Sequence, residues 1–202
     1  MKRYRMRPRP SIGAALLGSL LIYMVPGVAS AACEDPPAPQ VNWENCNKKS
    51  ASLVNADLRG ANLRKTNLMG AALGNINLQG ADLTEANLLS ANLSNANLSQ
   101  AILTKANLHG AVAVRTNFQN AELMQANLRR AMLRKANLTE ANLSETDLSE
   151  AELSDAVLTK ANLSGAKLKQ ADLGGVDLAD VVGLTPEQLE SALKEKDRHI
   201  QR

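Results

Sequence analysis

A repeat of five residues runs through most of this chain and constrains its fold more than any other feature. From Ala51 to Asp180 the unit Ala-Asn/Asp-Leu-x-x recurs without insertion or deletion, which gives 26 central positions. Leu occupies 24 of these positions, and Ala113 and Phe118 occupy the other two. A short and fixed period predicts a stacked architecture, in which each unit buries its apolar side against neighbouring units.

Neither an α-helix nor a straight β-strand can bury such a repeat on one side. In a helix, five residues turn through about 500°, so successive leucines lie about 140° apart. In a strand, an odd period places successive leucines on alternate faces. The Ala and the Leu of one unit, however, are two residues apart and point to the same side of a short extended segment. If the chain turns at the two x positions, which are rich in Gly, Ser, Thr, Asn and charged residues, the sequence predicts a polygonal coil.

The charges predict four units, or twenty residues, per turn of this coil. The last residue of each unit should lie above its counterpart one turn earlier, where opposite charges attract. At a separation of four units, six charged pairs, such as Lys65/Glu85, are opposite in sign and only Arg115/Lys135 is alike. At a separation of three units, three charged pairs are opposite in sign and two are alike. At a separation of five units, two pairs are opposite and three are alike. Twenty-six units at four per turn predict about 6.5 coils.

The same register stacks two columns of asparagines: Asn67, Asn87, Asn107 and Asn127, and Asn77, Asn97, Asn117 and Asn137.

The segment after the repeat predicts a helix that covers the end of the stack. Thr185 is a good N-cap, Pro186 suits the first helical position, and Gln188 completes a capping box. Leu184 and Leu189 are placed for a hydrophobic staple. We therefore expect residues 51–180 to form the coils and residues 181–202 to form a C-terminal capping helix and tail.

The segment before the repeat predicts the opposite cap. Residues 32–50 are rich in proline and contain Trp43, Cys33 and Cys46, the last two being the only cysteines, with twelve residues between them. In an oxidising compartment such a pair most simply forms a disulfide. The alternatives are two free thiols, or a lipidated Cys33 with Cys46 unpaired. With only two cysteines and no histidine in residues 32–50, we do not expect a metal site here.

Residues 1–31 have the plan of a secretory signal peptide. A start with five basic and no acidic residues precedes an apolar stretch over residues 11–25, and Ala29 and Ala31 suit cleavage near Ala31/Ala32. The apolar stretch is shorter than the roughly 20 residues that a membrane-spanning helix needs. We therefore expect a periplasmic or secreted bacterial protein. Two alternatives would place the chain at a membrane. The first is an uncleaved N-terminal anchor. The second is a lipoprotein in which Cys33 is lipidated, although Ser30 stands where a lipoprotein signal usually has Leu.

Composition and charge argue against several classes of function. Without residues 1–31 the chain has 18 basic and 20 acidic residues, a net charge of −2, and its only aromatic residues are Trp43 and Phe118. Direct nucleic-acid binding is therefore not expected. The acidic run from Glu140 to Asp155 should spread around a full coil as a solvated ladder rather than meet in a cleft. We expect no catalytic residues, no cofactor and no metal.

One irregular stretch predicts a site for a partner. Val112 and Val114 replace outward polar residues, and Met132 follows Val112 by one predicted turn. The small Ala113 can make room in the core for the larger Phe118, so that the core volume is kept. This compensation does not explain the outward residues Val112, Val114 and Met132. Single exposed apolar residues are also normal, so a surface without function is the alternative. The candidate patch, for an unidentified protein or a second copy of the chain, comprises Val112, Val114, Met132, Arg115, Arg129 and Arg130.

Units such as Ala-Asn-Leu-Ser-x and Ala-Asp-Leu-x-x, over about 130 residues, resemble the pentapeptide-repeat family. This resemblance implies an all-β solenoid, a right-handed quadrilateral β-helix. It does not imply one function. A non-catalytic exported structural or protein-interaction module of the cell envelope is the function expected here. The alternative is a DNA-mimicking, gyrase-protecting protein. Family members of that kind have strongly acidic surfaces, work in the cytoplasm and dimerise through their C-terminal ends, whereas this chain has a net charge of −2 and a leader.

Overall fold

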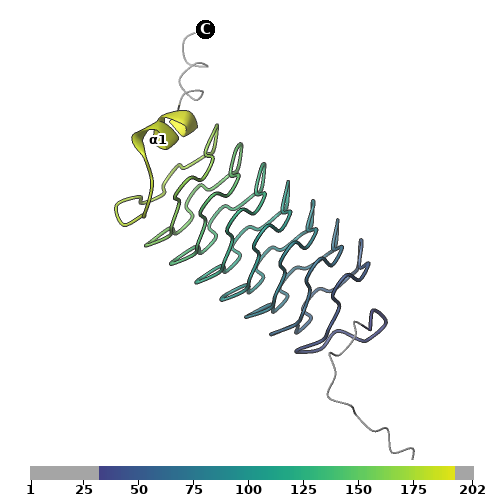
Figure 1. Ribbon diagram of the computed structural model, residues 1–202. Helices are drawn as coiled ribbons and strands as arrows, with labels where there is room; N and C mark the ends of the chain where they lie inside the picture. Colours follow the sequence, from purple (N-terminus) through teal and green to yellow (C-terminus); the bar gives the residue numbers. More distant parts are fainter. Residues whose placement is uncertain (1–31, 194–202) are drawn as a thin grey trace, which may run out of the picture.

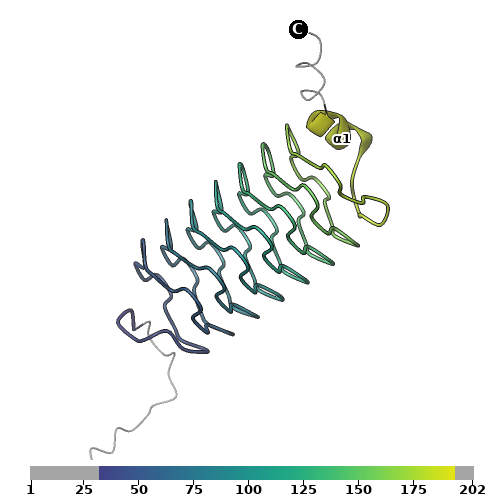
Figure 2. The same cartoon turned by 180° about the vertical axis from the view of Figure 1, so that it is seen from behind.

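Parallel pairing between residues twenty positions apart builds the fold. Each bridged residue, from Asn42↔Asn62 to Asn162↔Val182, pairs with the residue twenty positions later in the chain. The computed structural model describes residues 32–193 and shows the coils stacked into a straight rod (Figure 1), which Figure 2 shows from behind. The prediction of four units per coil is confirmed. The expected signal peptide and the tail beyond residue 193 lie outside the described residues.

The rod has four sides, which we name A to D in the order in which the chain visits them. Each side carries one bridged, outward-facing residue per coil, and these residues form a column along the rod. The columns begin at Asn42 on side A, Asn47 on side B, Ser52 on side C and Asp57 on side D. Both predicted asparagine columns exist, on the opposite sides B and D. Their amides bond along the stack, as in Asn97 Nδ2 to Asn77 Oδ1 at 3.3 Å.

Each unit turns its corner through a fixed backbone pattern. The last residue of nearly every unit has a positive φ; there are 22 such residues that are not glycine, with φ between 54° and 62°. The Asn or Asp of the unit supports the turn, because its Oδ1 accepts the N–H two residues on, as from Ser94 to Asn92 at 3.0 Å. The second residue of the unit therefore points outward, while the first and third point inward.

The core consists of the Ala and Leu columns of the four sides. The central leucines of the units, from Leu58 to Leu168, have exposed fractions of 2% or less. Ala113 and Phe118 are both completely buried in the same coil, in agreement with the predicted exchange of volume. Three threonines replace the inward Ala, and each hydroxyl donates to a main-chain carbonyl oxygen: Thr66 to Trp43, Thr116 to Leu93 and Thr146 to Leu143.

The stack begins ten residues earlier than the sequence predicted. Bridges start at Asn42, and Trp43, which is completely buried, occupies the position of the central Leu in its unit. The boundary between an N-terminal cap at residues 32–50 and coils at residues 51–180 is therefore corrected. Residues 41–50 form two further units, in which Cys46 stands in place of the inward Ala and Lys48 in place of Leu. The Nζ of Lys48 lies 3.9 Å from the centroid of the Trp43 ring.

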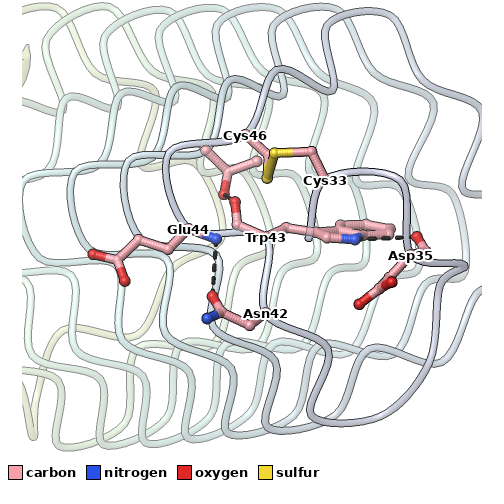
Figure 3. Close-up of a disulfide and its surroundings, with 7 residues drawn as sticks. Cys33, Asp35, Asn42, Trp43, Glu44 and Cys46 are labelled. Atoms are coloured by element: carbon pink, nitrogen blue, oxygen red, sulfur yellow. Dashed lines mark hydrogen bonds between the residues drawn. A yellow bond between two sulfur atoms is a disulfide. The ribbon is translucent and has the colours of Figure 1, made fainter. Parts of the chain in front are cut away.

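A disulfide holds the segment that covers this end of the rod. Cys33 is bonded to Cys46, and their Cα atoms are 5.4 Å apart. The indole N–H of Trp43 donates to the carbonyl oxygen of Asp35 at 3.2 Å (Figure 3). Residues 33–40 thus lie over the outer edge of the first coil.

At the other end, helix α1 (Pro186–Leu193) lies against the last coil (Figure 1). The main-chain N–H of Thr185 donates to Gln188 Oε1, and the N–H of Gln188 donates to Thr185 Oγ1, which forms the predicted capping box. Gln188 Nε2 also donates to the carbonyl oxygens of Leu163 and Ala166 at 3.0 and 2.8 Å. None of the described helices is long and apolar enough to cross a membrane.

Candidate interaction surface

The patch predicted from the sequence lies on side C, in the middle of the rod. The bridge Val112↔Met132 places these two side chains in neighbouring coils of one column, as predicted. Their main-chain neighbours Ala111, Ala113 and Leu133 point into the core and are completely buried, which fixes the outward direction of Val112 and Met132. The full column of side C is Ser52, Ala72, Asn92, Val112, Met132, Glu152 and Asp172.

Two rows of basic residues border the patch. Arg129 and Arg130 lie at the turn between sides B and C, and Arg115 lies at the turn between sides C and D. The structure adds Arg134 and Lys135, which follow Val114 and Arg115 by twenty residues and therefore lie one coil above them. The twenty-residue register that places Met132 above Val112 also places Arg134 above Val114 and Lys135 above Arg115. The same register could therefore have predicted these two basic residues from the sequence.

The three apolar residues of the patch are less accessible than the sequence suggested. Val112, Val114 and Met132 are half-buried rather than exposed. A side chain in a column packs against its counterparts one coil above and one coil below, and this contact removes part of its surface from water. The most exposed large apolar residues in the described part of the chain are scattered over several sides: Val54, Ile102, Val157 and Val182.

The basic residues of the patch form ion pairs with acids of the next coil. Arg129 Nη2 and Arg130 Nε lie 2.9 and 2.6 Å from the two carboxylate oxygens of Glu150. Arg134 Nε lies 3.6 Å from Glu152 Oε2. Hydrogen bonds from Arg130 and then from Arg129 hold the pKa of the Glu150 carboxyl below its ordinary value. Side C thus carries a row of positive charge directly below a row of negative charge.

The acids between Glu140 and Asp155 do not converge. Glu140 lies 3.8 Å from Lys160 Nζ, and Glu145 accepts a hydrogen bond from Gln125 at 2.7 Å. Asp147 Oδ1 accepts the main-chain N–H of Ser149. Among residues 32–193 no group of three or more His, Cys, Asp or Glu side chains is arranged to hold a metal ion.

A shallow hollow of about 370 Å³ lies between α1 and side B. Lys167, Lys169, Glu187 and Gln188 line it, together with Leu168 and three small residues. The amide of Gln188 is engaged by main-chain carbonyl oxygens and by Thr185. We therefore interpret the hollow as the packing boundary between the helix and the coils.

These features define the class of protein: a four-sided parallel β-helix built from five-residue units. A sequence profile described as pentapeptide repeats matches eight times, over residues 40–70, 62–100, 91–130, 101–139 and 136–175. The chain belongs to the pentapeptide-repeat family. The first match begins at residue 40, in agreement with the earlier start of the coils. No curated protein matches the sequence.

Solved structures of pentapeptide repeat proteins resemble the chain. HetL of the cyanobacterium Nostoc sp. strain PCC 7120, involved in heterocyst differentiation regulation, is 30% identical, with 71% of this chain and 79% of HetL covered and a TM-score of 0.38. A protein of the Arabidopsis thaliana thylakoid lumen is 26% identical, with 58% and 90% covered and a TM-score of 0.51. QnrB1, a plasmid-mediated fluoroquinolone resistance protein, is 18% identical, with 77% and 95% covered and a TM-score of 0.46.

Proposed function

We propose that this protein is a non-catalytic, exported module of the bacterial cell envelope that acts through protein–protein contact on side C. The observation that carries this proposal is the break in the outer surface at Val112, Val114 and Met132. The remaining columns present mainly asparagines and charged residues, which look alike from coil to coil. A partner that binds at one place on the rod needs such a break.

The composition of the patch suits a protein partner. Half-buried aliphatic side chains form its centre, and arginines form its border. Arginine and methionine are enriched in protein interfaces, and arginine is frequent among the residues that contribute most to binding. Because the apolar side chains are held by neighbours above and below, little conformational entropy would be lost when a partner covers them.

Export is supported by the leader and by the disulfide. Residues 1–31 follow the three-part plan of a signal peptide, with cleavage proposed near Ala31/Ala32. Cys33 then lies at or next to the new N-terminus, bonded to Cys46. Disulfides persist in oxidising compartments and are rare in the bacterial cytosol. A disulfide-bonded Cys33 is not available for lipidation, so the proposal is a soluble periplasmic or secreted protein.

The gyrase-protecting alternative has less support. The likeness to QnrB1 is at 18% identity and concerns the fold alone. A surface that imitates DNA has to be acidic along its length, whereas side C carries arginines in the middle of the rod. We therefore keep envelope interaction as the proposed function.

Affinity capture tests the proposal. The mature protein is used as bait in periplasmic extract, beside the triple variant Val112→Asn, Val114→Ser, Met132→Asn, which restores residue types common in the repeat. The matched control changes three exposed apolar residues on sides A and D: Ile102→Asn, Val157→Asn and Val182→Asn. The proposal requires that the first variant loses the captured proteins and the control keeps them.

Two results would overturn it. Identical captured proteins with both triple variants would show that side C is not the binding surface. Isolation of the protein from the cytosol with Met1 intact would remove the argument for export.

A further inference from the structure

The charges on side C are sorted by coil. Around this side, coil 121–140 has only basic residues: Arg129, Arg130, Arg134 and Lys135. Coil 141–160 has only acidic residues there: Glu150, Glu152 and Asp155. The side chains remain accessible, with exposed fractions of 44% for Arg129, 61% for Arg130 and 51% for Arg134.

We propose that side C binds side C of a second copy of this chain, with the two rods antiparallel and coil 121–140 of each copy facing coil 141–160 of the other. This inference rests on the proposed function, because it names the partner of side C. In this register Met132 and Val112 lie opposite Glu152 and Asp172 of the second copy, so the rows of charge, rather than the apolar side chains, carry the contact between the copies. A two-fold axis parallel to the strands of side C, between these coils, generates the arrangement. Such an isologous contact uses the same side of the rod in both copies and closes as a dimer.

In this arrangement every charged row has neighbours of opposite sign in two directions. Glu150 already lies against Arg129 and Arg130 of its own chain. The two-fold axis keeps the strand direction, so the same Glu150 meets the Arg129 and Arg130 row of the second copy. Asp155 likewise meets Arg134 and Lys135 of the second copy. Basic and acidic rows therefore alternate both along each rod and across the contact between the two copies.

The charges also select the register and the direction of the rods. A shift by one coil in either sense places coil 121–140 opposite itself or coil 141–160 opposite itself, so that like charges face each other. A parallel arrangement places every coil opposite its own copy, with the same result. Like-charge contacts disfavour wrong pairings, so electrostatics here specifies the geometry of the dimer more than it adds affinity.

The contact is small. Four coils, 101–180, extend about 15 Å along the rod at a strand spacing of about 4.8 Å. An interface of that length and one side in width falls below the roughly 1,000 Å² expected for a stable dimer. We therefore expect a weak and reversible dimer that dissociates as salt screens the charges.

A charge swap tests the arrangement with the mature, disulfide-bonded protein. The acidic variant carries Arg134→Glu and Lys135→Glu, and the basic variant carries Glu152→Lys and Asp155→Lys. Sedimentation equilibrium measures the dissociation constant of each variant alone and of an equimolar mixture, at low salt. We expect each variant alone to dimerise at least about tenfold more weakly than the wild type. The mixture should recover dimers, because opposite charges then face each other in both halves. In one half the acidic coil 121–140 of the first variant faces the basic coil 141–160 of the second, and in the other half the two unchanged coils face each other.

The chain with all four changes is the matched control. It restores opposite charges both within the chain and across the contact, so it should dimerise like the wild type. If a double variant unfolds, single changes at Lys135 and Asp155 repeat the test, because neither residue forms a close ion pair with another residue of the described range 32–193. A wild type that stays monomeric at low salt, or variants that dimerise as it does, would overturn the inference. If those results coincide with loss of captured proteins in the Val112, Val114 and Met132 variant, the proposed function stands and only the second copy is excluded.

Discussion

The hydroxyl of Thr66 donates a hydrogen bond of 2.7 Å to the main-chain carbonyl oxygen of Trp43, in the coil below. Both residues are completely buried. The same carbonyl oxygen also accepts the N–H of Cys46 at 3.0 Å, in the turn of its own coil. Thr66 therefore ties the first coil, where the aromatic ring replaces leucine, to the regular stack above it.

Thr66→Val should lower the free energy of unfolding by about 1 kcal/mol, because a methyl group replaces the hydroxyl and the bond between the coils is lost while the shape is kept. Chemical denaturation followed by circular dichroism measures this. Unchanged stability would mean that the N–H of Cys46 alone satisfies the carbonyl oxygen of Trp43.

Gln100→Gly should stabilise the protein, although glycine usually destabilises regular structure. Gln100 has a φ of 59°, a left-handed conformation that costs about 1–2 kcal/mol for residues with a Cβ atom. The neighbouring Ser99→Gly is the matched control: the φ of Ser99 is not positive, so glycine there only adds freedom to the unfolded chain and should cost about 0.5–1 kcal/mol. The two variants should move the unfolding midpoint in opposite directions, and a shared direction would contradict the turn analysis.

Gly183→Ala should release helix α1 from the coils. Gly183 has a φ of 72°, and a Cβ atom there would lie 2.8 Å from the Cα atom of Ser164. The main-chain N–H of Gln170 donates to the carbonyl oxygen of Ser191 in α1 at 3.1 Å, so its hydrogen exchange reports whether the helix is docked. We expect exchange at Gln170 to become at least about tenfold faster.

The control for this variant is Gly80→Ala. Gly80 also has a positive φ, of 65°, but no atom lies within 4 Å of the added Cβ. Gly80→Ala should lower global stability slightly and leave exchange at Gln170 unchanged. Equal acceleration in both variants would show that backbone strain alone, rather than contact with Ser164, controls the position of α1.

Removal of the disulfide should destabilise the N-terminal end of the rod. The bond between Cys33 and Cys46 closes a loop across 13 positions, which corresponds to about 3 kcal/mol in the chain-entropy model. We expect the variant with both cysteines changed to alanine to lose that amount and the fluorescence of Trp43 to become accessible to quenchers. Wild-type protein under reducing conditions should behave in the same way, and an unchanged unfolding curve in either sample would contradict this assignment.

Acid should remove a contribution from Asp82. Burial raises the pKa of its carboxyl, but hydrogen bonds from Thr84 and Arg64 outweigh burial and hold the pKa below 3.8. A depressed pKa in the folded state stabilises the protein above the pKa of the unfolded state and is lost as pH falls through the folded value. The stability advantage of wild type over Asp82→Asn should therefore be constant near pH 7 and shrink below about pH 4. A constant difference down to pH 2 would contradict the pairing.

The sequence predicted the coil well because its period and its charges act through contacts that repeat at every turn. Of the six pairs of opposite charge found at a separation of four units, three are ion pairs in the structure: Lys65–Glu85, Arg130–Glu150 and Glu140–Lys160. The first two units were missed because Trp43 and Lys48 stand where leucine identifies a unit. Asn42 and Asn47, in phase with the later asparagines, were the remaining signal.

The candidate surface was predicted less completely than the coil. The register placed Val112 and Met132 correctly, but the half-burial of their side chains depends on the volume of neighbours in adjacent coils, which a pattern of residue types does not contain. The pairing of Arg129 with Glu150 at a separation of 21 residues also escaped the sequence analysis, because the bond is diagonal across a turn.

The twenty-residue register has a consequence for how the length of such a chain can change. Deleting one unit of five residues would rotate every later residue by a quarter turn about the rod axis. A deletion before Asn127 would move this residue out of its asparagine column, and a deletion between Lys135 and Glu150 would place the basic and acidic rows of side C on different sides. Deleting or duplicating twenty residues keeps every column in phase. Chains of this kind can therefore lengthen by whole coils without disturbing their surfaces. The insertion or deletion of a single unit, in contrast, moves the residues of every later column to a different side of the rod.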